Sequence, residues 1–64
     1  MIANGGPLQL PDGSTLADLL THLGLEARWV VAEHNGRAVE RAEVATAKLA
    51  DGDRVELVRA VAGG

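Results

Sequence analysis

The sequence has no cysteine, tyrosine or phenylalanine, and Trp29 is the only aromatic residue among its 64. Without cysteine it cannot form a disulfide framework or a thiolate zinc site. A small secreted domain usually depends on such crosslinks, so we expect the protein in the cytoplasm. No stretch approaches the roughly 18 apolar residues of a membrane span, and the N-terminus has no basic, apolar start typical of a secretion signal. We therefore expect no membrane partner.

Positive charge is also sparse. The formal net charge is −3, and the six basic residues are spread singly along the chain. Nucleic-acid binding usually requires a basic cluster, often with aromatic side chains for stacking, and neither is present. A mildly acidic surface keeps a small protein soluble and is also compatible with docking onto a basic protein face. We predict no nucleic-acid partner.

The short length and the small side chains limit what the fold can enclose. A chain of this size forms one domain, residues 1–64, with a core of leucine, valine and alanine. Such a core leaves little room for a ligand pocket of a few hundred Å³. We expect a protein that is not an enzyme and binds no cofactor itself.

One helix is clearly indicated at residues 15–23. Thr15 and Asp18 have the spacing of a capping box, and Gly24 stands where a left-handed residue ends a helix. The apolar residues between them have the i, i+3, i+4, i+7 spacing of an amphipathic helix. They are Leu16, Leu19, Leu20 and Leu23.

Extended segments precede and follow this helix. Asn4–Pro7 predicts a turn between two short strands, the second at Leu8–Leu10. Trp29–His34 is rich in β-forming residues and ends at Asn35-Gly36, the strongest short hairpin signal, so the return strand is expected at residues 37–40.

The remaining segment, residues 41–49, has no clear period and predicts a connection with at most a short helical turn. Asp51–Asp53 predicts a turn, and Arg54–Val61 the last strand. The order predicts an α+β fold in which a mixed sheet of about five strands packs on one helix. The first and last strands are expected side by side in the middle of the sheet.

Alternation along the last strand predicts which residues face the helix. Val55 and Leu57 would share one face, whereas Glu56 and Val58 would lie on the other. Exposed apolar residues near the end of this strand would form a docking surface for partner proteins. The predicted docking residues are Val58, Ala60, Val30 and Ala32.

The chain ends in Gly63-Gly64, directly after this strand. A terminus without side chains offers chemistry only its α-carboxylate, and it can enter a narrow site where that carboxylate is activated. We expect residues 61–64 to be a flexible tail because they have little to bury.

The element order and the terminal diglycine resemble the ubiquitin-like β-grasp fold. More narrowly, the chain resembles the ThiS-type sulfur carrier proteins of thiamine biosynthesis. The resemblance covers nearly the whole chain and is most specific at its C-terminal end. It rests on the total length, the helix start at Thr15–Leu20, the hairpin at Val31–Gly36 and the segment from Asp51 to Gly64.

The resemblance implies a carrier that is a protein co-substrate. Gly64 would be adenylated by a ThiF-like enzyme that uses ATP, and then converted to a thiocarboxylate. Gly63 and Ala62 would form the slim tail. A sulfur-donor protein and thiazole synthase would be the other partners, and the free chain would be a monomer.

Other functions remain open on the sequence alone. They are a molybdopterin-synthase-type sulfur carrier, a ubiquitin-like modifier conjugated to lysine, and an interaction module whose tail is incidental. The tail lacks the prolines usual in the molybdopterin relatives. No metal site is expected, because Asp51 and Asp53 suit a turn better than a calcium site, and His22 and His34 suit a solvated surface.

Overall fold

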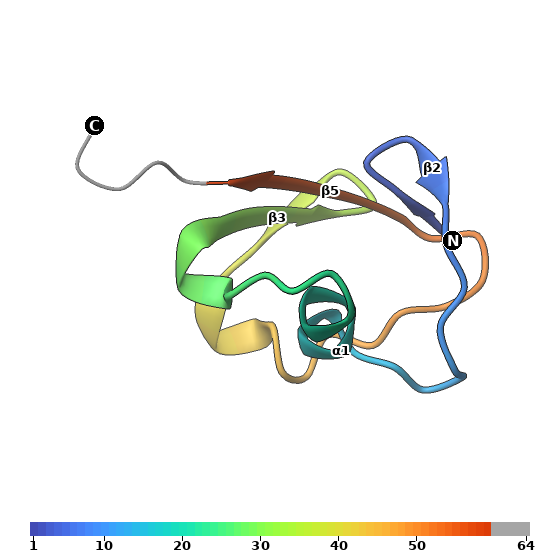
Figure 1. Cartoon of the computed structure of the whole chain (residues 1–64), viewed down its shortest axis with the longest axis horizontal. Coiled ribbons are helices and arrows are strands. Elements are labelled where there is room, and N and C mark those ends of the chain that lie inside the picture. Colours follow the sequence, from blue (N-terminus) through green and yellow to red (C-terminus); the bar gives the residue numbers. More distant parts are fainter. Residues whose placement is uncertain (60–64) are drawn as a thin grey trace.

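The computed structural model describes residues 1–59, in which a five-stranded sheet packs against one α-helix. The strand order is β2-β1-β5-β3-β4. Figure 1 shows α1 and both 3₁₀ helices (green and yellow) on the same side of the sheet. The elements are β1 (Ile2–Ala3), β2 (Gly6–Pro7), α1 (Leu16–His22), η1 (Ala27–Trp29), β3 (Val30–His34), β4 (Arg37–Val39), η2 (Arg41–Glu43) and β5 (Arg54–Arg59).

The sheet is mixed, and β5 lies at its centre. β1 pairs with β5 in parallel, whereas β3 pairs with it in antiparallel orientation. The predicted α+β fold, with the first and last strands adjacent, is therefore confirmed. The strand that leads to the C-terminus therefore has a hydrogen-bonded neighbour on each side.

Helix α1 begins and ends where the sequence predicts. The Thr15 hydroxyl accepts a hydrogen bond from the Asp18 amide, and the Asp18 carboxylate accepts one from the Thr15 amide. At the other end, Gly24 has a φ of +72°, and the Leu25 amide donates to the Leu20 carbonyl. The Gly24 amide donates to the Thr21 carbonyl, and the two bonds form the Schellman motif expected around a glycine at C′.

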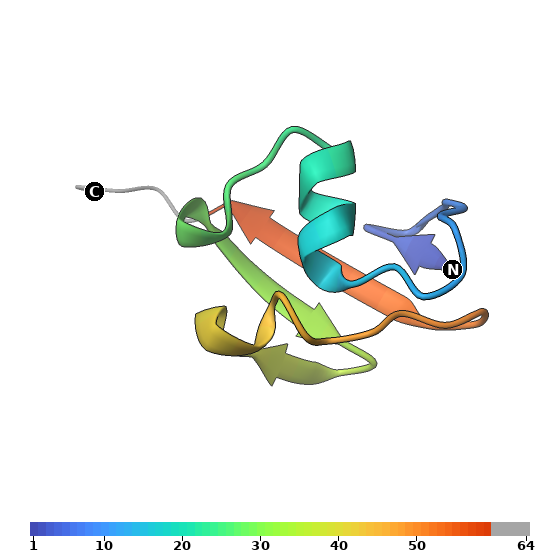
Figure 2. The ribbon, with the colours of Figure 1, turned by 90° about the horizontal axis from the view of Figure 1, so that it is seen from below.

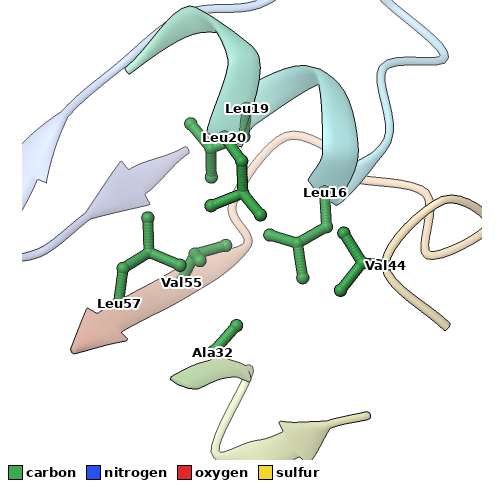
Figure 3. Close-up of a cluster of buried hydrophobic side chains, with 7 residues drawn as sticks. All are labelled: Leu16, Leu19, Leu20, Ala32, Val44, Val55 and Leu57. Carbon is green, nitrogen blue, oxygen red and sulfur yellow. The ribbon is translucent and has the colours of Figure 1, made fainter. Parts of the chain in front are cut away.

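The core lies between α1 and the sheet (Figure 3). Leu16 and Leu19 on the helix and Val55 on β5 are completely buried. Leu23, the fourth residue of the predicted stripe, is instead 41% exposed, because it is the C-cap after which the chain leaves the helix axis. Leu25, beyond the cap, packs against the core. The buried cluster consists of Leu16, Leu19, Leu20, Ala32, Val44, Val55 and Leu57.

The predicted hairpin is confirmed at Asn35-Gly36. Both residues have positive φ, as a type I′ turn requires, and β3 and β4 pair on either side of them. Trp29, predicted to begin the strand, belongs to η1 instead. The connection after β4 contains the short helical turn η2, as the sequence indicated.

The second strand is not at Leu8–Leu10 as predicted but at Gly6–Pro7. Asn4 and Gly5 make a tight turn with φ of 51° and 82°, so β2 returns along β1 at once. Met1 and Leu8 exchange one more pair of hydrogen bonds, after which the chain leaves the sheet. The positive φ that asparagine tolerates places the turn earlier than strand alternation suggested.

Asn4 also extends the pairing of the short β1. Its amide donates to the Val55 carbonyl, and its side-chain oxygen accepts from the Leu57 amide at 2.7 Å. In a continued parallel ladder, a strand carbonyl would accept this bond. The Asn4 side chain therefore replaces the missing strand residue and satisfies an amide of a buried residue of β5.

Candidate functional site

The candidate site begins where β5 ends. Arg59, the last residue described, pairs with Val30, the first residue of β3. Figure 2, seen from the helix side, shows β5 (orange) running across the molecule to this end of the sheet. The predicted site residues Ala60, Ala62, Gly63 and Gly64 lie outside the described residues.

Alternation along β5 places apolar side chains on both faces of the sheet. Val55 is fully buried and Leu57 is 9% exposed beneath α1, whereas Val58 is 63% exposed on the opposite face. That opposite face is the open face, because the helices lie on the other side (Figure 1). The structure thus places Val58 where the sequence predicted, although its docking role remains a prediction.

The prediction of a docking role was wrong for Val30 and Ala32 of β3, because both lie on the face that α1 covers and not on the open face. Ala32 is opposite Leu57 and only 3% exposed, so it belongs to the core. Val30 has the same parity and also packs against the core. Directly opposed residues of antiparallel strands share a face, and this places Val31 beside Val58. Val31 is 53% exposed and was missed.

A sequence signal for this parity was available at Glu33. Two residues after Val31, Glu33 shares its face, and a carboxylate is rarely buried without a partner. If Glu33 is assigned to the solvent-exposed face of the sheet, Val31 must be assigned to that face as well. The open face next to the end of β5 therefore carries two valines, one from each central strand.

A polar cluster fastens the far end of the β3–β5 pair. The Asp53 carboxylate lies 2.7 Å from His34 Nε2 and accepts from the Ala50 amide at 2.8 Å and the Asn35 side chain at 3.2 Å. Asn35 in turn accepts from the Arg54 amide. The hydrogen bond with His34, then those from Ala50 and Asn35, lower the pKa of Asp53 from 3.8 to about 2.

These contacts correct the interpretation of His34 as a solvated surface residue. Its side chain is 22% exposed and bound to Asp53, which the sequence interpretation had assigned to the turn alone. The two residues are 19 positions apart, so local pattern gave no signal for the pair. The cluster joins the β3–β4 turn to the turn before β5.

Neither metal binding nor membrane insertion is indicated by the described part of the chain. Residues 1–59 contain no group of three or more histidine, aspartate or glutamate side chains placed to hold a metal ion. No helix within them is long and apolar enough to cross a membrane.

Trp29 is 42% exposed, and the Arg28 guanidinium lies 5.4 Å from the centre of its ring. Trp29 is therefore a rim residue rather than part of the core.

Residues 1–59 have the fold of a β-grasp protein, in which a mixed sheet packs on one α-helix and the central strand β5 leads toward the C-terminus. The ThiS family model matches residues 4–64, nearly the whole chain. The chain belongs to the ThiS family, and it is a small carrier protein of the ThiS type.

Solved structures agree with this assignment. The crystal structure of the thiamine biosynthesis protein ThiS from Geobacter metallireducens is 30% identical, with a TM-score of 0.82. The match covers 98% of this chain and 96% of that one. An NMR structure of a thiamine biosynthesis protein from the same organism is 29% identical with a TM-score of 0.78, covering 98% and 85% of the two chains. A comparison with curated proteins finds no match.

Proposed function

We propose that this chain carries sulfur for synthesis of the thiamine thiazole on the carboxylate of Gly64. A ThiF-like enzyme joins this carboxylate to the AMP of ATP, with pyrophosphate as the leaving group. Sulfur at the oxidation level of sulfide, supplied by a donor protein, then attacks the acyl carbon and expels AMP. The resulting thiocarboxylate delivers its sulfur to thiazole synthase.

The observation that carries this proposal is the match to the ThiS family through residue 64 itself. A free carboxylate is a poor electrophile, and adenylation supplies the leaving group that sulfur needs. Gly63 and Gly64 have no β-carbons, so a narrow channel in the activating enzyme can admit them. In this proposal the chain supplies no catalytic group to the reaction and binds no cofactor.

The held end of β5 supports the same role. β1 pairs with the start of β5, at Arg54 and Val55, whereas β3 pairs with β5 up to its end, where Arg59 is opposite Val30. A partner that binds the open face therefore meets the end of β5 at a fixed position. We assign docking to Val31 and Val58, which form an exposed apolar pair next to that position.

The test is conversion of the purified chain by a ThiF-like enzyme from the same genome with ATP and sulfide. The intact mass should show one oxygen replaced by sulfur, and the product should react with an alkylating reagent. A chain that lacks Gly64 is the matched control and should remain unmodified. Alkylation is required because oxidation of Met1 would give nearly the same mass change. An unmodified wild-type chain under these conditions would contradict the proposal.

The pathway is tested in a second step. Thiocarboxylated chain is mixed either with thiazole synthase and its substrates or with the large subunit of molybdopterin synthase. Loss of the thiocarboxylate with formation of the thiazole supports the thiamine role. Consumption by the molybdopterin enzyme alone would assign the carrier to the other pathway.

A further inference from the structure

The open face carries two adjacent pairs of side chains with different chemistry. Val31 is opposite Val58, and Glu33 is opposite Glu56. All four are exposed. The pairs are two residues apart along each strand, which corresponds to about 7 Å. The open face thus carries an apolar pair near the end of β5 and an acidic pair further from that end.

No contact within the fold explains why the two glutamates, Glu33 and Glu56, lie opposite each other. Directly opposed side chains have β-carbons about 5 Å apart, and like charges at that distance destabilise a sheet. Arg54 lies on the same face, two residues before Glu56. However, the ion pairs within residues 1–59 are Arg28–Glu26 and His34–Asp53, so neither Glu33 nor Glu56 is paired there.

We propose that Glu33 and Glu56 bind an arginine or lysine on the activating enzyme, while Val31 and Val58 contact an apolar patch beside that cation. This inference rests on the proposed carrier function and adds the chemistry of the partner surface. Two carboxylates side by side complement one guanidinium or ammonium group, and the apolar pair marks the face as a protein contact. The partner's cation lies beside its apolar patch, on the side away from the end of β5.

The chain also sets the distance between this contact and the chemistry. Six peptide units separate Val58 from Gly64, and an extended chain covers about 20 Å over that length. The apolar patch of the activating enzyme therefore lies no further than about 20 Å from the atom that attacks ATP. A cation that meets Glu33 and Glu56 lies about 7 Å beyond it.

The test measures thiocarboxylate formation by the ThiF-like enzyme, with ATP and sulfide, at several salt concentrations. Glu33→Gln/Glu56→Gln should raise the KM for the carrier roughly five- to tenfold at low salt, the loss expected for two accessible ion pairs. The KM of the double variant should also depend less on salt than that of wild type. The value of kcat should stay within about twofold because the tail is unchanged.

Asp12→Ser/Asp51→Ser is the matched control. It removes the same charge from two exposed turns outside the open face and should retain the wild-type KM and salt dependence. Equal KM values and salt slopes in wild type, Gln variant and control would overturn the inference while the carrier function stands. A wild-type chain that is never modified would instead remove the carrier function itself.

Self-association is measured alongside by sedimentation. Wild type and both variants should be monomeric at the assay concentration. If the Gln variant dimerises and keeps a wild-type KM, the acidic pair serves to prevent self-association, and the inference is overturned. Charge reversal, Glu33→Lys/Glu56→Lys, should raise the KM further than the Gln variant, and a lower KM would contradict the proposed cation.

Discussion

Val55 and Val58 are three residues apart on β5, yet Val55 is fully buried beneath α1 and Val58 is 63% exposed on the open face. The same strands therefore form two faces of the sheet that have different roles. The face toward α1 provides the packing that holds the domain together. The open face contributes little burial, so its side chains are free to be selected for contact with partners.

The largest expected effect comes from comparing the same truncation on the two faces. Val55→Ala should lower the free energy of unfolding by about 2–3 kcal/mol, because it removes two buried methyl groups and leaves a cavity. Val58→Ala should change it by less than about 0.5 kcal/mol. Urea denaturation followed by circular dichroism measures both. Similar losses in the two variants would show that both faces are packed.

Substitutions of Asn4 test the backbone pairing of β5 without changing the side chains that pack on its two faces. Asn4→Gly keeps the positive φ but leaves the Leu57 amide without its acceptor, which should cost about 1–2 kcal/mol. Asn4→Asp retains an acceptor oxygen and should cost less. The same urea titration checks both. An Asn4→Gly variant as stable as wild type would show that this side-chain bond does not stabilise β5.

The Val31–Val58 pair should matter for function rather than stability. Val31→Ala/Val58→Ala should raise the KM of thiocarboxylate formation roughly five- to tenfold, the effect of about 1 kcal/mol of lost apolar contact. The urea midpoint should change little. Leu23→Ala, which truncates the exposed C-cap residue that follows α1, is the control and should leave the KM unchanged. Equal KM values in both variants would place the docking surface elsewhere.

Acid should weaken the far end of the central strands through Asp53. Its pKa is about 2 in the folded chain and 3.8 ordinarily, so the unfolded chain binds the proton more readily. The stabilisation is fully present above about pH 4 and is lost as the pH falls toward 2. Asp53→Asn should therefore be less stable than wild type at pH 6, and the difference should shrink below pH 4. A constant difference would mean that the carboxylate charge is irrelevant.

The smallest effect is expected where charge repulsion is relieved on the open face. Glu33→Gln should raise the free energy of unfolding by about 0.2–0.5 kcal/mol at low salt. Added salt should reduce the gain. Denaturation at two salt concentrations measures it, with Asp12→Ser as the comparison variant. A loss of stability would show that Glu33 has a favourable partner in the sheet.

Several features followed directly from the sequence because their causes are local. The capping box at Thr15, the glycine after α1 and the Asn35-Gly36 turn each depend on a few neighbouring residues. Alternation along β5 likewise assigned Val55 and Val58 to opposite faces correctly. The candidate site was predictable to the extent that it depends on β5 and on the terminal Gly63-Gly64.

Features that depend on distant partners were missed or assigned wrongly. The face of Ala32 depends on its pairing with Leu57, 25 positions later in the chain. The His34–Asp53 contact joins two turns, and Asn4 reaches Leu57 across 53 positions. No periodicity within a single segment contains this information.

The sequence by itself determined the amphipathic helix with its caps, the Asn35-Gly36 hairpin and the glycine terminus, because capping, turn conformation and side-chain size act over a few residues. Only the tertiary structure decided the register of β3 against β5. That register moved Ala32 into the core and brought Val31 beside Val58 and Glu33 opposite Glu56. A shift of one residue would exchange the faces of a whole strand, and long-range packing against α1 selects between the alternatives.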